Sequence, residues 1–182
     1  LTAHRDLLAS EEPRLRAQAR DFLLRVQQAF PHLPVRLISA LAEGGDQLVA
    51  EEALALGLDL MVPLPLPQEE YERDFEDPAA LQRFRALLAR ARVRTLPLAP
   101  GSDPAAVRLR GEARNRQYAQ LGMFVSSRCQ ILLALWDGVP SQATGGTAQV
   151  VDYHLRNSMQ GFNPEDAAPN LLADDESDLV YR

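Results

Sequence analysis

The sequence predicts an α/β protein with a doubly wound, mostly parallel sheet and helices on both faces. Helix-like and strand-like segments alternate along the 182 residues. The strand-like segments are apolar runs without polar alternation, which is typical of strands buried on both faces of a parallel sheet. Polar or glycine-rich turns follow several of these strands, at the sheet edge where such folds bind their ligands.

The composition favours a single globular domain over residues 1–182. Hydrophobic residues make up 46% of the chain and charged residues 24%, which excludes a disordered tail and a collagen-like fibre. No apolar run approaches the roughly 20 residues of a membrane span, and no segment has the pattern of a signal peptide. The single cysteine, Cys129, excludes an internal disulfide and fits a cytoplasmic location.

The amino-terminal half predicts strands and helices in alternation. The chain opens in a strand that ends at the turn Thr2-Ala3-His4-Arg5. Apolar residues at helical spacing predict a helix over 13–30, and an apolar run predicts a buried strand over 35–40. A turn over 43–46 precedes a helix over 47–56, which Gly57 ends. The run 58–64 predicts another buried strand, terminated by prolines.

The second half continues the same alternation. We expect an amphipathic helix over 77–92, a strand over 93–98, a long helix over 103–126 and a strong strand over 130–136. A loop over 137–146 then leads into a helix over 147–159. The acidic stretch 161–177 has loop composition, and 179–182 has the pattern of an opening strand. Because the sequence starts without methionine and stops within this strand, we interpret it as an excerpt whose first and last strands are cut.

The negative charge is concentrated at the carboxyl end. Residues 160–182 carry six acids against one base, Arg182, and contribute −5 of the net −6. The remaining residues are close to neutral and therefore give no strong signal for nucleic-acid binding. All 19 basic residues are arginines, which excludes Schiff-base chemistry and a P-loop lysine.

Two glycine-rich turns predict an anion site. Each precedes a helix, and the backbone N–H groups at a helix start bind phosphate when glycine allows a close approach. The alternative is that the glycines only serve turn geometry. The candidate phosphate ligands, including the pair that follows the first strand, are Gly44, Gly45, Gly145, Gly146, Thr147, His4 and Arg5.

Further candidates lie near the same sheet edge. We expect Tyr71, Trp136 or Asp137 to contact a ring or a ribose, although Trp136 would equally fill the rim of the core. Arg114 and Arg116 are candidate anion contacts, with a solvated helical face as the alternative. The sequence contains no metal-ligand or dinucleotide fingerprint, and we therefore predict neither a metal nor a cofactor.

Several segments in order resemble the SLOG superfamily of Rossmann-like domains. That superfamily includes the LOG (lysine-decarboxylase-like) phosphoribohydrolases, the DNA-processing protein A group and stand-alone nucleotide-sensing domains. The similarity is strongest to uncharacterised, sensor-like members and spans nearly the whole chain. It rests on the turn 2–5, the segments Ser39-Ala40-Leu41-Ala42-Glu43-Gly44-Gly45-Asp46 and Glu70-Tyr71-Glu72-Arg73-Asp74-Phe75, the strand that ends at Trp136-Asp137-Gly138, and Gly145-Gly146-Thr147.

The resemblance implies phosphate binding but not hydrolysis. In the LOG enzymes a turn Gly-Gly-x-Gly-Thr-x-x-Glu supplies an acid that takes part in cleaving an N-glycosidic bond. Here the turn is shorter, and Val150 stands three residues after Thr147 where the acid is expected. The phosphate-binding role therefore carries over to Gly145, Gly146 and Thr147, and the hydrolytic role does not.

We therefore expect a sensor domain for a nucleotide or a nucleotide derivative such as an ADP-ribose-like molecule. It would report binding to an effector region elsewhere in a longer chain, and homo-oligomers are common among the relatives that the resemblance implies. One alternative is a LOG-type nucleoside 5′-monophosphate phosphoribohydrolase in which Glu43 or Asp46 replaces the missing acid. Another is a nucleic-acid-associated module, which the near-neutral body disfavours.

Overall fold

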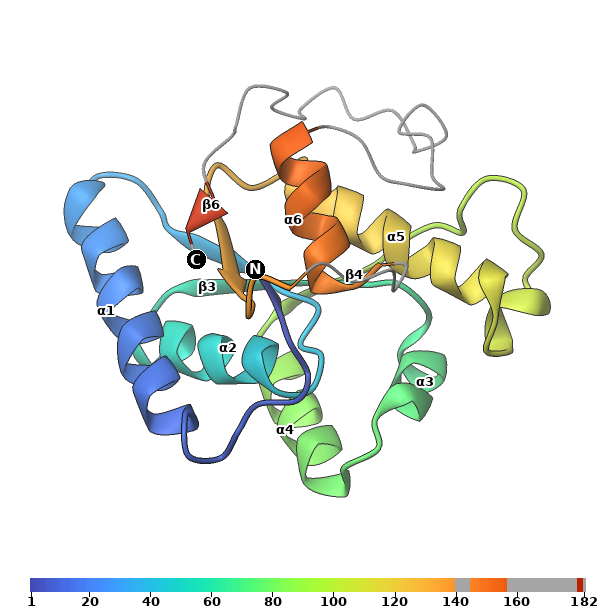
Figure 1. Cartoon of the computed structure of the whole chain (residues 1–182), viewed down its shortest axis with the longest axis horizontal. Helices are drawn as coiled ribbons and strands as arrows, with labels where there is room; N and C mark the ends of the chain where they lie inside the picture. The colour runs from blue at the N-terminus through green and yellow to red at the C-terminus, as the bar shows by residue number, and fades with distance from the viewer. Residues whose placement is uncertain (140–144, 157–179, 182) are drawn as a thin grey trace.

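The computed structural model describes residues 1–139, 145–156 and 180–181, and in these residues helices and strands alternate (Figure 1). The strands are β1 (Thr2–Ala3), β2 (Arg36–Ile38), β3 (Asp59–Leu64), β4 (Arg92–Thr95), β5 (Leu132–Leu135) and β6 (Val180–Tyr181). The helices are α1 (Glu12–Ala29), α2 (Gly45–Ala55), α3 (Gln68–Tyr71), α4 (Pro78–Leu88), α5 (Glu112–Ser126) and α6 (Thr147–Arg156), with short 3-10 helices η1 (Glu72–Asp74) and η2 (Ala106–Arg108).

The strands pair in parallel in the orders β1-β5-β6 and β2-β3-β4. The backbone nitrogen of Leu1 donates a hydrogen bond to the carbonyl of Ile38 at 2.9 Å, which joins the two groups of strands. β1 thus has β5 on one side and β2 on the other. The chain leaves β1 toward β2 and later returns to β5, so the sheet has a topological switch point beside β1.

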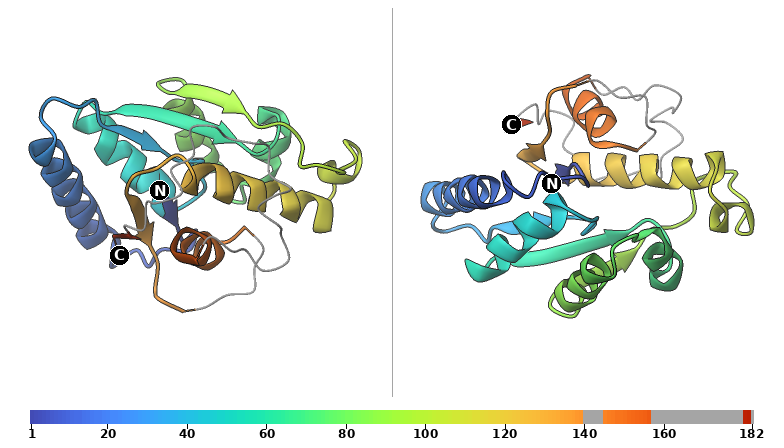
Figure 2. Two further views of the ribbon diagram at one scale, coloured as in Figure 1. Left: turned by 90° about the horizontal axis from the view of Figure 1, so that it is seen from above. Right: turned by 60° about the horizontal axis from the view of Figure 1, so that its bottom comes forward.

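Helices cover both faces of the sheet, as the sequence predicts. Side chains alternate between the faces along a strand. In β3, Leu60, Val62 and Leu64 pack with α1, α2 and α4, whereas Met61 packs with α5 and α6 on the opposite face. Figure 2 shows α5 and α6 on the other side of β3 from α4. The chain is therefore a doubly wound, Rossmann-like α/β fold.

Local sequence explains how α4 begins. Asp77 caps the helix, because its carboxylate accepts hydrogen bonds from the backbone nitrogens of Ala79 at 2.9 Å and Ala80 at 3.2 Å. Pro78 occupies the first helical position, where its missing N–H costs no hydrogen bond. The prediction of a helix over 77–92 is correct in kind, but the helix ends at Leu88.

Two predictions about the elements are wrong. The helix expected from residue 103 begins only at Glu112, since the preceding residues form η2 and Gly111 has a φ of 152°. β4 was expected to be buried on both faces, yet each of its residues is exposed because β4 is the last strand of its group. The expected loop over 161–177 and the last residues of the helix expected over 147–159 lie outside the described residues.

The helices found in the described part of the chain do not include one that is both long and apolar enough to span a membrane.

Candidate functional site

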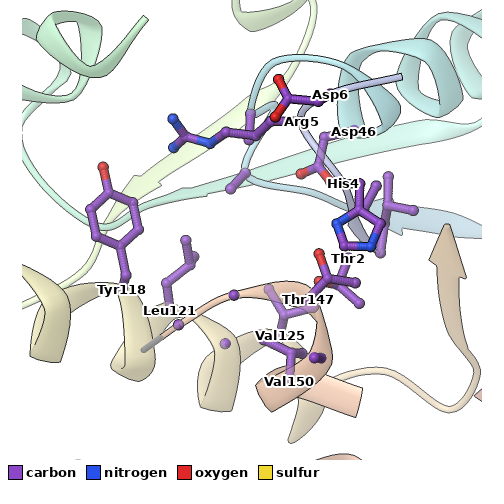
Figure 3. A pocket seen from close by; sticks show the side chains of 18 of the residues that line it. Thr2, His4, Arg5, Asp6, Asp46, Tyr118, Leu121, Val125, Thr147 and Val150 are labelled. Atoms are coloured by element: carbon purple, nitrogen blue, oxygen red, sulfur yellow. The ribbon is translucent and has the colours of Figure 1, made fainter. Parts of the chain in front are cut away.

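A cleft of about 540 Å³ opens at the carboxyl ends of β1 and β5 (Figure 3). This is the topological switch point, where doubly wound sheets bind ligands, and the volume lies within the usual range for small-molecule sites. The cleft is lined by the segment 1–6, the turn after β2, one face of α5 and the amino end of α6. Segments that are far apart in the sequence therefore meet at one place.

The turn after β1 brings His4 and Arg5 into the cleft, as the sequence predicts. The backbone nitrogen of His4 donates to the carbonyl of Leu135 at 3.0 Å, which ties the turn to the end of β5. The side chain of His4 shares a hydrogen bond with Asp137, with 3.2 Å between Nε2 and Oδ1. The backbone N–H of Val139 and the hydrogen bond from His4 lower the pKa of the Asp137 carboxyl.

Arg5 lies at the mouth of the cleft and remains exposed. Its guanidinium makes one long hydrogen bond, from Nη1 to the backbone carbonyl of Asp74 at 3.4 Å. In Figure 3 the side chain of Arg5 extends across the cleft toward Tyr118. A guanidinium carries five N–H donors, so Arg5 retains donors for an anion.

The amino end of α6 forms the opposite wall. Gly145, Gly146, Thr147 and Ala148 line the cleft, and the first intrahelical bonds run from the nitrogens of Gln149 and Val150 to the carbonyl of Gly146. The N–H groups of residues 146–148 precede these bonds and therefore have no intrahelical acceptor. The helix dipole adds partial positive charge at the same point.

Gly145 allows this wall to lie close to α5. Its φ of 78° favours glycine, and a Cβ there would lie 2.6 Å from the Cβ of Tyr118. The nitrogen of Gly145 donates to Oε1 of Gln149 at 2.5 Å. Close packing against α5 is thus one reason for glycine at this position.

The first glycine pair is placed differently from the second. Gly44 and Gly45 do not line the cleft. A Cβ on Gly44 would lie 2.0 Å from the carbonyl oxygen of Arg5, and one on Gly45 would lie 2.5 Å from the Cβ of Ala3. The nitrogen of Gly45 already donates to the carbonyl of His4 at 3.1 Å. These glycines let α2 approach the turn after β1, and the structure does not bring them to the cleft as the prediction required.

Of the two candidate acids, Asp46 lies in the cleft and Glu43 does not. Oε1 of Glu43 accepts from the backbone nitrogens of Glu76 at 2.7 Å and Asp77 at 3.1 Å, so it holds the segment before α4. Asp46 is buried and accepts a hydrogen bond from the hydroxyl of Ser39 at 2.9 Å. Burial raises the pKa of the Asp46 carboxyl.

The backbone beside Asp46 is strained. Leu41 is fully buried and adopts a φ of 58°, a backbone conformation that residues other than glycine rarely adopt. Its nitrogen donates to the hydroxyl of Ser39 at 3.0 Å, and its carbonyl accepts from the amide of Gln47 at 3.3 Å. Such strain persists only where surrounding contacts fix the backbone, and here these bonds shape the turn that lines the cleft.

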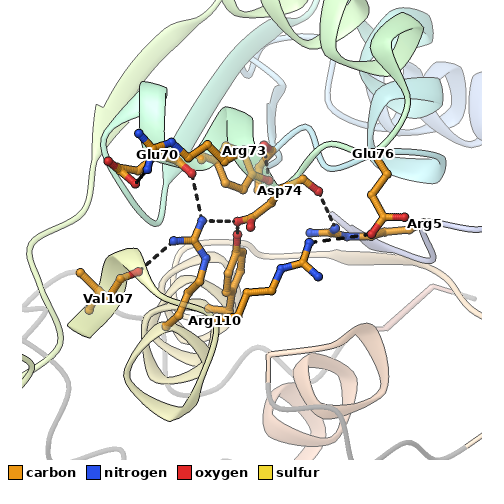
Figure 4. A network of polar contacts seen from close by, with 11 residues as sticks. Arg5, Glu70, Arg73, Asp74, Glu76, Val107 and Arg110 are labelled. Carbon is orange, nitrogen blue, oxygen red and sulfur yellow. Dashed lines mark hydrogen bonds and ion pairs between the residues drawn. The ribbon is translucent and has the colours of Figure 1, made fainter. Parts of the chain in front are cut away.

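The arginines of α5, which the sequence predicts as anion contacts, do not line the cleft. Arg114 does not line the cleft; it is buried and donates to the carbonyls of Val107 at 2.8 Å and Glu70 at 2.9 Å and to the carboxylate of Asp74 at 2.6 Å (Figure 4). The anion that pairs with Arg114 is therefore the Asp74 carboxylate of the protein itself. Arg116 also lies outside the cleft lining and is half-buried.

Of the three predicted ring or ribose contacts, Tyr71 and Asp137 line the cleft and Trp136 does not. Tyr71 lines the cleft but is almost fully buried, with its hydroxyl donating to the carbonyl of Ala40 at 3.2 Å. Trp136 is not in the lining; its Nε1 donates to the carbonyl of Val139 at 3.0 Å and its ring packs against the core. Asp137 lines the cleft.

The structure adds a wall that the sequence analysis missed. Tyr118, Leu121, Gly122 and Val125 of α5 form a largely apolar face of the cleft. The Tyr118 hydroxyl donates to the carboxylate of Asp74, and burial together with that carboxylate raises the pKa of Tyr118. The i, i+3, i+4 and i+7 spacing marks these residues as one helical face, but only the fold shows that this face meets a cleft.

Comparison with models of protein families found no match, and comparison with curated proteins found none. Within residues 1–139, 145–156 and 180–181, no group of three or more His, Cys, Asp and Glu side chains is placed to hold a metal ion.

Proposed function

We propose that this cleft binds a nucleotide or a nucleotide derivative such as an ADP-ribose-like molecule, and that the domain acts as a sensor of that ligand. The observation that carries the proposal is the meeting of the turn after β1, with His4 and Arg5, and the amino end of α6 in one cleft. Helix amino ends and arginine both favour phosphate. The SLOG resemblance of the sequence is consistent with this assignment.

The phosphate would lie between Arg5 and the amino end of α6. Backbone N–H groups of residues 146–148 and the Thr147 hydroxyl offer donors there, and the guanidinium supplies the charge. The base would pack on the face formed by Tyr118, Leu121 and Val125, where aromatic and apolar side chains suit a flat ring. The Asp137 carboxylate is an acceptor for a ribose hydroxyl.

Titration calorimetry tests the proposal with AMP, cyclic AMP, ATP, NAD and ADP-ribose. We expect at least one of them to bind. Arg5→Gln and Thr147→Val should each weaken that binding by about tenfold, because the first variant loses a charged hydrogen bond and the second a neutral one. Arg83→Gln is the matched control, because Arg83 is exposed on α4 and outside the cleft. Absence of binding by every nucleotide would refute the proposal.

A second function, N-glycosidase activity of the phosphoribohydrolase type, is favoured by one observation. Asp46 is a buried carboxyl in the cleft lining, and a carboxyl of raised pKa is suited to general acid–base catalysis. Chromatography of the same mixtures would detect a released base. Release by the wild type and its loss in Asp46→Asn, with ligand binding retained, would identify an enzyme rather than a sensor.

A further inference from the structure

The ionisable groups of the cleft are mostly acidic. Among the residues that the structure describes, Arg5 is the one arginine in the lining, accompanied by His4. Three carboxyls of the same described part, Asp6, Asp46 and Asp137, line the cleft. Arg114, the neighbouring buried arginine, is engaged by Asp74 and two carbonyls. The positive charge available to a ligand is therefore small.

Asp6 is the exposed acid of the lining without a partner among the described residues. It follows Arg5 in the chain, and Figure 3 shows both side chains at the same end of the cleft. Asp6 is exposed, and within the described part of the chain no hydrogen bond or ion pair engages its carboxylate. Asp137, by contrast, is paired with His4. Asp6 thus presents an unpaired carboxylate at the end of the cleft where the Arg5 side chain begins (Figure 3).

We infer that the cleft selects phosphate groups of low charge, namely phosphodiesters, over terminal phosphates, and that Asp6 is the repulsive element in this selection. The inference rests on the proposed function. A phosphodiester carries one negative charge, and a terminal phosphate carries about 1.5 to 2 at neutral pH. Arg5 and the α6 dipole together stabilise the first negative charge of the phosphate. The second negative charge is repelled by the Asp6 carboxylate. Specificity commonly depends on such a repulsive element as well as on attraction.

The test uses ligand pairs in which esterification lowers the charge of the terminal phosphate. The first pair is AMP and its 5′-O-methyl phosphodiester, and the second is ADP and ADP-ribose. Titration calorimetry at low salt would compare the wild type with Asp6→Asn. Asp21→Asn is the matched control, because it removes the same charge from an exposed position on α1 outside the cleft.

We expect the wild type to bind the methyl phosphodiester more tightly than AMP. We likewise expect it to bind ADP-ribose, in which each of the two phosphates carries one charge, more tightly than ADP. Asp6→Asn should strengthen AMP or ADP binding by about threefold, an effect of the size typical of exposed charge pairs. The same variant should change diester binding little. Added salt should reduce the preference of the wild type.

Two other results are informative. Tighter binding of the more highly charged partner, or the same preference in Asp6→Asn as in the wild type, would overturn the inference while leaving nucleotide binding intact. Failure of these four ligands to bind to either protein would overturn the inference. It would refute the proposed function as well if cyclic AMP, ATP and NAD also failed to bind.

Discussion

At the scale of single residues, Asp74 shows how one carboxylate organises the border of the cleft. It accepts hydrogen bonds from Arg114 and Tyr118, and its backbone carbonyl accepts from Arg5. Arg114 is buried, and a buried charge is stable only when it is paired. Sequence patterns placed Arg114 among candidate anion contacts, which was chemically sensible, but they contain no information on which anion it meets.

Asp74→Ala should therefore destabilise the fold strongly. The change leaves the buried Arg114 cation without its carboxylate, and we expect the free energy of unfolding to fall by about 3 kcal/mol. Urea denaturation measures this. Asp21→Ala breaks the exposed pair with Arg25 and should cost about 0.5 kcal/mol or less. Equal losses in the two variants would show that the Asp74 carboxylate does not compensate Arg114.

The buried carboxyl of Asp46 predicts a specific pH dependence. Burial raises its pKa in the native state, so above the unfolded value of about 3.9 the native state holds more protons than the unfolded state. The Asp46 contribution to the free energy of unfolding therefore decreases as pH rises through the native pKa. Asp46→Asn removes this dependence. We expect the stability of Asp46→Asn relative to the wild type to increase in urea denaturation as the pH rises above the unfolded value of about 3.9 and through the native pKa. A constant or falling difference would contradict the assignment.

At the scale of elements, periodicity predicted the type and order of most helices and strands but not their boundaries or exposure. Apolar runs identified β3 and β5 correctly because both are buried for most of their length. The same reasoning failed for β4, because its position at the end of the strand order leaves it exposed. The glycine pairs illustrate a similar limit: sequence cannot distinguish a glycine that admits a ligand from one that admits a neighbouring backbone.

Gly44 and Gly57 form a matched pair that tests this distinction. Their φ angles are 78° and 77°, so alanine strains the backbone at both. The ψ of −121° at Gly44 adds to that strain, because it lies outside the left-handed helical region. A Cβ on Gly44 would lie 2.0 Å from the carbonyl oxygen of Arg5, whereas a Cβ on Gly57 meets nothing within 4 Å. Gly57→Ala should cost about 1 kcal/mol. Gly44→Ala should cost several kcal/mol more by denaturation, since backbone cannot move aside cheaply, and similar costs would argue against close packing of α2 on the turn.

At the scale of the whole molecule, the site follows from topology. The order of the strands places the reversal of the chain beside β1, and this brings segments from the start, the middle and the end of the described chain to one cleft. The sequence analysis predicted this sheet edge and named His4, Arg5 and Thr147, which line the cleft. It missed Tyr118 and Leu121 because a helix face has no local signature for the cleft that it borders, and it misplaced Gly44 because turn geometry and ligand binding favour the same residue.

The topology also predicts which segments a bound ligand will protect from amide hydrogen exchange. Because the cleft is lined by residues 1–6, the α5 face around Tyr118–Val125 and the amino end of α6, a ligand at this place should slow amide hydrogen exchange in all three segments together. Saturation at a hundred times Kd stabilises the native state by about 2.7 kcal/mol against global unfolding. Exchange governed by local opening in α1 and β4, which do not line the cleft, should change little. Hydrogen-exchange mass spectrometry of the nucleotide complex against the free protein measures this pattern. Protection of α4 and β4 in place of the three segments would move the binding site to the sheet edge at β4, where Arg92 and Arg94 are exposed.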